Sequence, residues 1–192
     1  SDSGGNAGSY SHGIATYALG EAYIMTGDPD YRAPFLSGIE KIIYAQAPDG
    51  GWMYGMDGKN VNSDTSVSGW QIQALKSAYL AGLDEVASEV EEALDEAVEN
   101  MKRVHNAESG SFGYRSPDKK RKNLTGVGVF TMSMWKHGRS KEVRRGTEFI
   151  MERVEEEHGW TDDDGDLIYE KQHLYSMYYD VRRKRCRAKQ AG

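Results

Sequence analysis

The chain has 192 residues, of which 38% are hydrophobic, so it is large enough for one hydrophobic core but too short for two comfortable domains. Its formal net charge of -6 gives it no general affinity for nucleic acid, which is therefore not an expected partner. No run approaches the roughly 18 apolar residues of a membrane-spanning helix, so no transmembrane segment is expected. The single cysteine, Cys186, excludes an internal disulfide and favours a cytoplasmic location, although a secreted or periplasmic protein whose signal peptide had been removed would look the same.

Hydrophobic periodicity predicts helices along the whole chain, because apolar residues recur at helical spacing and nothing alternates with a period of two. Pro29, Pro48, Gly82 and Gly138 interrupt this pattern. Asp64 or Thr65 can cap the third helix with a side-chain oxygen. The fold class is therefore predicted to be all-α. The predicted helices span about 11–25, 31–47, 65–81, 85–105, 124–137, 141–157 and 167–179.

Three segments are expected along the chain. Residues 1–10 are expected to form a flexible leader, 11–180 a single helical domain, and 181–192 a basic tail with six positive charges. The tail is either a disordered, solubilising end or a binding site for acidic lipid, for nucleic acid or for the acidic body of another copy.

An internal repeat organises the predicted domain. Gly13-x4-Ala18-Leu19-x2-Ala22-Tyr23 aligns with Gly69-x4-Ala74-Leu75-x2-Ala78-Tyr79 at an offset of 69 - 13 = 56, and a weaker copy begins at Gly128. Between these inner helices lie outer helices that end in Gln46…Gly50-Gly-Trp52, His105…Gly110-Ser-Phe112 and, more weakly, Gly159-Trp160. Such hairpins bury their apolar faces only by stacking on their neighbours.

The repeat predicts a role for each recurring residue type. Gly13, Gly69 and Gly128 are expected to let inner helices approach closely, and Trp52 and Phe112 to fold back over the turn with the help of Gly50 and Gly110. Gln46 is expected to hydrogen-bond the loop backbone or the adjacent repeat. These are structural roles.

The string Gly38-x2-Lys41-Ile42-x3-Gln46-x3-Gly50-x-Trp52 resembles the QW repeat of the squalene-hopene cyclase and protein prenyltransferase superfamily. The stretches SYSHGIATYALGEAYIMTGD, AQAPDGGWMY, DTSVSGWQIQALKSAYLAGL and LTGVGV resemble bacterial prenyltransferase and squalene oxidase repeat proteins. The resemblance implies an α/α toroid. A full ring of this superfamily has about six hairpins, whereas this chain has about three and a half, so an incomplete ring closed by a second copy or another partner is expected.

The resemblance also locates candidate catalytic residues. Class II cyclases of the superfamily protonate an alkene with the central Asp of an Asp-x-Asp-Asp-Thr-Ala motif, and the corresponding stretch here is Val61-Asn62-Ser63-Asp64-Thr65-Ser66. Ser63 stands in place of the proton donor, and a serine hydroxyl cannot protonate an alkene. Asp64 is therefore interpreted first as a helix cap, and Asp64 and His12 are weak catalytic candidates.

No cofactor is expected. Protein prenyltransferases bind zinc with Asp, Cys and His, but Cys186 lies in the tail and the five histidines show no paired ligand spacing. Asp162, Asp164 and Asp166 alternate as in a calcium loop, but Leu167 stands where that pattern needs glycine. A solvated acidic turn is the favoured interpretation of this segment.

Aromatic side chains on the inner helices suggest either a pocket for a hydrophobic molecule such as a polyisoprenoid or ordinary helix packing. The candidates, with one histidine, are Tyr10, His12, Trp70, Tyr79, Phe130, Tyr175 and Tyr178. The sequence thus favours a protein-interaction or hydrophobic-ligand-binding module without a recognisable catalytic acid or metal. The alternative is an isoprenoid cyclase or prenyltransferase-related enzyme that a partner or further segments complete.

Overall fold

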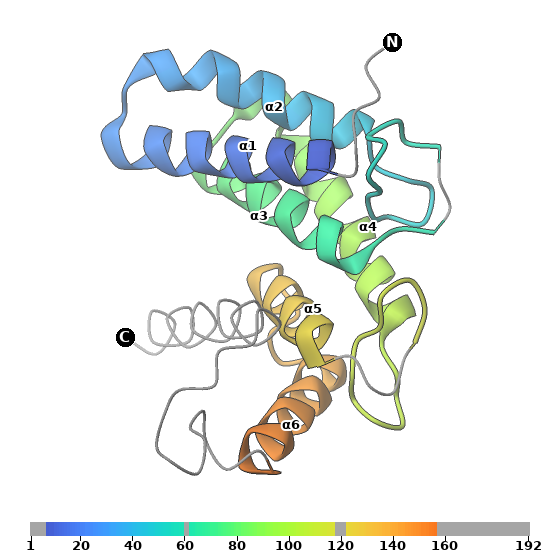
Figure 1. Cartoon of the computed structure of the whole chain (residues 1–192). Helices are drawn as coiled ribbons and strands as arrows, with labels where there is room; N and C mark the ends of the chain where they lie inside the picture. Colours follow the sequence, from blue (N-terminus) through green and yellow to red (C-terminus); the bar gives the residue numbers. More distant parts are fainter. Residues whose placement is uncertain (1–6, 60–61, 118–121, 157–192) are drawn as a thin grey trace, which may run out of the picture. The chain divides into compact units, whose positions relative to one another are not determined.

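The computed structural model describes residues 7–59, 62–117 and 122–156 (Figure 1). Within these ranges all regular elements are helical apart from one isolated bridge between His105 and Phe112, which confirms the all-α class. The helices are α1 (Ala7–Thr26), α2 (Arg32–Tyr44), α3 (Thr65–Ala81), α4 (Ala87–Val104), α5 (Lys122–Met134) and α6 (Lys141–Glu156), and short 3-10 helices precede α2 (Pro29–Tyr31) and α4 (Asp84–Val86). The helix predicted at 167–179 and the tail at 181–192 lie outside the described residues.

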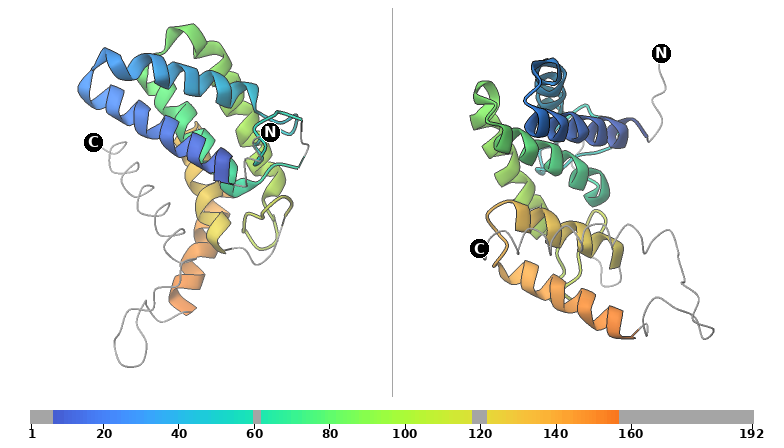
Figure 2. Two further views of the ribbon diagram at one scale, coloured as in Figure 1. Left: turned by 45° about the horizontal axis from the view of Figure 1, so that its top comes forward. Right: turned by 90° about the vertical axis from the view of Figure 1, so that its left-hand side faces the viewer.

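The chain divides into two compact units, Ser1–Asn100 and Met101–Gly192. In the first unit, α1 lies against both α2 and α3, and its contact with α3 is the larger (Figures 1 and 2). Gly13 allows α1 and α3 to approach closely, because a Cβ at that position would lie 2.7 Å from the Nε2 atom of Gln71 on α3. The close approach predicted at Gly13 is therefore confirmed. Fully buried side chains of this unit include Phe35, Ile39, Ile42, Trp52, Val67 and Leu75.

In the second unit, α5 and α6 lie side by side (Figure 2). A Cβ at Gly128 of α5 would collide with the ring of Phe112, the aromatic residue that follows α4. The role predicted for Gly128 was therefore wrong, since this glycine makes room for an aromatic side chain and not for a neighbouring inner helix. The unit's buried side chains include Phe112, Phe130, Trp135, Val143 and Phe149.

The turns that follow α2 and α4 share one design. The N–H of Ala47 donates to the Gly51 carbonyl at 2.8 Å, and the N–H of Asn106 donates to the Ser111 carbonyl at the same distance. Gly50 and Gly110 have φ angles of 82° and 83°, a region that favours glycine. Trp52 and Phe112 are both fully buried. The fold is thus repeat-like, and the backbone freedom predicted at Gly50 and Gly110 is confirmed.

Each of these turns is also fixed against the next outer helix. The Cα of Gly50 lies so close to the carbonyl group of Glu96 in α4 that no Cβ would fit, and Gly110 lies in the same way against the carbonyl group of Arg145 in α6. Gln46 reinforces the first contact, because its Nε2 donates to the carbonyls of Gly50 at 2.9 Å and Ala93 at 2.8 Å. Both hydrogen bonds predicted for Gln46 are confirmed.

Three helix boundaries differ by three or more residues from those predicted. α1 begins at Ala7 and not at Ser11, because Ser9 is buried and its carbonyl accepts a hydrogen bond from Gln71 Nε2 at 2.9 Å. α2 ends at Tyr44, three residues early, where the chain turns into the loop. α5 ends at Met134 because Lys136 takes a φ of 58°. Contacts distant in sequence set the first of these limits.

Candidate functional site at the start of helix α3

The mouth of α3 is where the sequence placed its candidate acid, and Asp64 acts there as the N-cap. Its Oδ1 accepts from the backbone N–H groups of Ser66 at 2.8 Å and Val67 at 3.4 Å, and from the Ser66 hydroxyl. Its Oδ2 accepts from the Tyr54 hydroxyl at 2.7 Å. Asp64 is fully buried, and both of its oxygens are occupied as acceptors. The predicted helix cap is confirmed.

Tyr10 of α1 joins this cluster from the other side. Its hydroxyl is hydrogen-bonded to the Ser66 hydroxyl, and its ring lies 5.9 Å from the ring of Tyr54. Burial raises the pKa of Tyr10, and the nearby Asp64 carboxylate raises it further. Hydrogen bonds to Ser66 and, more weakly, to Tyr54 lower the pKa, but the net change is a rise. Tyr10 therefore stays protonated at neutral pH and serves as a hydrogen-bonding group.

Ser63, at the position that the resemblance assigns to a proton donor, binds Asp49. Its backbone N–H donates to Asp49 Oδ2 at 3.0 Å, and its hydroxyl donates to Asp49 Oδ1. The Asn100 Nδ2 atom donates to the Asp49 carbonyl at 2.7 Å, which ties the same residue to α4. Ser63 is fully buried. This pair closes the loop between α2 and α3 at its base.

The other predicted site residues point in different directions. His12 leaves the cluster, because its Nε2 is hydrogen-bonded to the Gly38 carbonyl of α2 at 3.0 Å. Trp70 of α3 is half-buried, whereas Tyr79 is 42% exposed with the Lys76 ammonium 4.5 Å from its ring centroid. Trp70 and Tyr79 are nine residues apart, about 13.5 Å along the helix. Of these aromatic candidates, the structure brings Tyr10 to Asp64.

The remaining candidates lie elsewhere in the chain. Phe130 belongs to the second unit, where it is 1% exposed and packs against Val127 and Met134. Its surroundings match the packing interpretation. Outside the described residues lie Tyr175 and Tyr178, together with Asp162, Asp164 and Asp166.

Two residues of the cluster, Asp49 and Tyr54, were missed by the sequence reasoning. Asp49 stands in the turn Pro48-Asp49-Gly50, a pattern that predicts a loop but not the loop's partner. Tyr54 lies ten residues before the carboxylate that it binds, and no local pattern marks it. The cluster as a whole holds the start of α3 against the loop and against α1, because its hydrogen bonds join these protein groups to one another.

Two absences hold for the described part of the chain. None of its helices is long and apolar enough to cross a membrane. No group of three or more histidine, cysteine, aspartate or glutamate side chains in the described ranges is placed to hold a metal ion.

Comparisons of the chain with protein-family models, with curated proteins and with solved structures found no match.

Proposed function

We propose that the chain is a protein-interaction module of stacked helical hairpins, and that the outward face of α1 receives a helical hairpin of a partner protein. The composition of α1 carries this proposal. Of its twenty residues only Glu21 is charged. In contrast, α4 has eight charged residues among eighteen, which is ordinary for a helix with one side in water.

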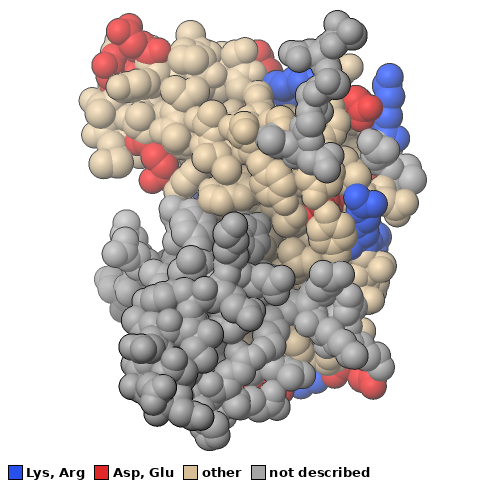
Figure 3. Space-filling view, viewed as in Figure 1, with Lys and Arg blue, Asp and Glu red and all other residues tan. Residues whose placement is uncertain are grey.

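Apart from Glu21, which lies one turn after Ala18, the side of α1 that no other described element of this unit covers carries no charged residue. Exposed residues on that side include Ile14, at 42% exposure, and Met25, at 80%, with Ala15 and Ala18 between them. Figure 3 shows this side, where most of the surface over α1 is neither acidic nor basic. Exposed apolar side chains that recur along one face of a helix typically mark an interaction surface, so this face is expected to be covered in the working protein.

A helix is the occupant that fits this face best. α1 already packs closely on its inward side, where Gly13, Gly20 and Gly38 mark contacts with no space for a Cβ. Its outward side again carries small residues one turn apart, Ala15 and Ala18, which permit a similarly close helix crossing. The proposal agrees with the expectation that a partner protein closes an incomplete ring of hairpins.

Site-specific photo-crosslinking in cells that naturally produce the protein tests this proposal. A photoreactive residue at Ala18 should yield one discrete protein adduct, and the same residue at Tyr44, which is 69% exposed on α2, should not. Ala15→Glu should abolish the adduct without changing the melting temperature, because Ala15 is exposed. Equal crosslinking from Ala18 and Tyr44, or an adduct insensitive to Ala15→Glu, would contradict the proposal.

The same face could instead bind an apolar small molecule, which native mass spectrometry of the freshly purified protein distinguishes. Retained mass in the range of a lipid or isoprenoid that Ala15→Glu removes would replace the protein partner with a hydrophobic ligand. A bare wild-type chain, together with the Ala18 adduct, would leave the partner protein as the occupant.

A further inference from the structure

A groove of about 530 Å³ lies along the outward side of α6, in the second unit, next to the turn that joins α5 to α6. Its lining residues are Gly138, Arg139 and Ser140 of the turn and Arg144, Thr147, Glu148 and Met151 of the helix. Met151 is 57% exposed, so the groove offers apolar contact beside its charged side chains. It is therefore a surface suited to a partner that carries both carboxylates and methylene groups.

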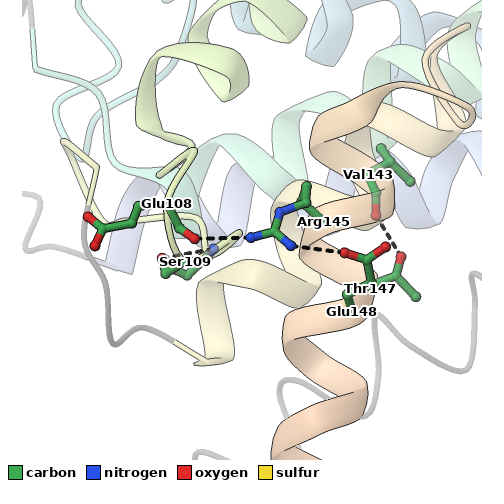
Figure 4. A network of polar contacts seen from close by, with 7 residues as sticks. Glu108, Ser109, Val143, Arg145, Thr147 and Glu148 are labelled. Atoms are coloured by element: carbon green, nitrogen blue, oxygen red, sulfur yellow. Dashed lines mark hydrogen bonds and ion pairs between the residues drawn. The ribbon is translucent and has the colours of Figure 1, made fainter.

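Among the described residues, two of the arginines at the groove have no partner of their own, unlike the adjacent Arg145. Arg145 donates hydrogen bonds to the Glu148 carboxylate at 3.1 Å and to the Glu108 carbonyl at 3.0 Å (Figure 4). The Thr147 hydroxyl donates to the Val143 carbonyl within the same helix. Arg139 and Arg144 are exposed, and in the part of the chain that the structure describes their side chains make no ion pair or hydrogen bond. Two guanidinium groups thus face solvent at the groove, while its one lining carboxylate, that of Glu148, is paired with Arg145.

A complementary surface exists on the same chain. From Asp84 to Glu99 the sequence has eight carboxylates and no lysine or arginine. Glu89, Glu92 and Glu96 are exposed on α4 at spacings of three and four residues, so they form one acidic row about 10.5 Å long. The nearby Glu85 differs, because Arg32 already pairs with it at 2.6 Å.

We propose that the groove of one copy binds the acidic row of α4 of a second copy. Arginine binds carboxylates through paired hydrogen bonds, and the glutamate methylenes can lie against Met151. The two surfaces differ, so the contact is head-to-tail and leaves every end copy with one free groove or one free row. Association therefore continues beyond a dimer, and salt weakens it because exposed charges dominate. This self-association uses a surface other than α1 and goes beyond the proposed function.

Sedimentation velocity over a range of protein concentrations tests the proposal with neutral variants. The wild type should show a weight-average mass that grows with concentration at low salt and falls to that of a monomer at high salt. Arg139→Gln/Arg144→Gln should be monomeric at low salt, and Glu89→Gln/Glu92→Gln/Glu96→Gln likewise. The matched control Arg115→Gln/Lys136→Gln removes two exposed charges of the second unit outside the groove and should associate like the wild type.

Mixing the two defective variants gives the sharpest result. One retains the acidic row and the other retains the groove, so together they should form a 1:1 complex that grows no further. Ala15→Glu should associate normally, which separates this proposal from the one for α1. A wild type that is monomeric at low salt at every concentration, association unchanged in either glutamine variant, or a mixture that stays monomeric would overturn the proposal.

Discussion

His105 occupies in the second unit the place that Gln46 occupies in the first. Each residue lies just before the shared turn, but the Nε2 of Gln46 donates to the Ala93 carbonyl, whereas the Nε2 of His105 is buried and, among the described residues, has no hydrogen-bond partner. Glu142 stands in α6 where Ala93 stands in α4, three residues before the carbonyl that meets the turn glycine. The histidine ring packs on Phe112, with 4.9 Å between ring centroids.

This replacement predicts a pH-dependent stability. Burial lowers the pKa of His105, Glu142 opposes the shift, and Lys141 and Arg145 add to it, with a net decrease. The unfolded chain therefore binds a proton on this histidine more readily than the folded chain. Stability from this residue is fully present above the unfolded value of about 6.5, and it is lost as the pH falls below that value.

His105→Gln tests the prediction, because glutamine restores the side chain of the first unit. The variant should lose the pH-dependent decrease in melting temperature between pH 7.5 and 5.5, and it should gain up to about 1 kcal/mol if the new amide reaches a carbonyl of α6. The titration of Glu142 is separate from that of His105. Burial raises the pKa of Glu142, but hydrogen bonds from backbone N–H and Ser140 and the charges of Lys141 and His105 lower it, with a net decrease. This group therefore changes the stability only below about pH 4.5. An unchanged slope in the variant would refute the assignment.

Loss of the Asp64 side chain should lower the free energy of unfolding, because Asp64 both caps α3 and binds the loop through the Tyr54 hydroxyl. Asp64→Ala should lose about 2 kcal/mol for the cap and about 1 kcal/mol more for the unpaired Tyr54 hydroxyl. Urea denaturation of Asp64→Ala, Tyr54→Phe and the double variant should give a coupling energy of at least about 0.5 kcal/mol. The exposed control Asp57→Ala should change stability by less than about 0.5 kcal/mol. Additive single effects would argue against the pairing.

Placing a carboxylate at Ser63 should destabilise the protein and not create an acid catalyst. Ser63→Asp puts a second carboxylate against Asp49 in a buried site, where two like charges cannot both ionise without a large penalty. The stability lost at pH 7 should exceed the roughly 1 kcal/mol lost in Ser63→Ala, and part of it should return near pH 5 as one carboxyl is protonated. A Ser63→Asp variant as stable as the wild type at pH 7 would contradict this.

Substitution of the turn glycines should reveal the contact with the next outer helix. Gly50→Ala and Gly110→Ala each combine a positive φ with a Cβ placed against a carbonyl group, and each should cost more than about 2 kcal/mol. Gly27 is the matched control, since its φ is 67° but a Cβ added there would have no described atom within 4 Å. Gly27→Ala should cost about 1 kcal/mol, the backbone penalty alone. Equal melting temperatures for the three variants would show that the contact adds nothing.

Much of the fold follows from local pattern. The helices could be predicted because apolar spacing and proline or glycine breaks act over a few residues, and the roles of Gln46 and Gly50 followed because the sequence repeats them. Gly128 was misjudged because its partner, the Phe112 ring, comes from a loop sixteen residues earlier. Side-chain direction across such a distance is set by packing, which periodicity does not describe.

The candidate site shows the same division more clearly. The cap at Asp64 was predictable, since capping is a local property of the first helical turn. Tyr54 and Asp49 were not, because each reaches its partner across a loop whose path depends on the whole unit. In the sequence, Tyr54 and Asp49 look like any other tyrosine and aspartate in a loop.

The fit of Gly50 against α4 has a consequence for how the protein opens. The N–H groups of Ala47 and Gly50 are enclosed in a turn that the neighbouring helix holds from outside. Their exchange with deuterium should therefore follow the departure of α4 and not the fraying of α2. Local unfolding of one hairpin would then first expose the loop of the preceding hairpin, so unfolding would proceed toward the N-terminus.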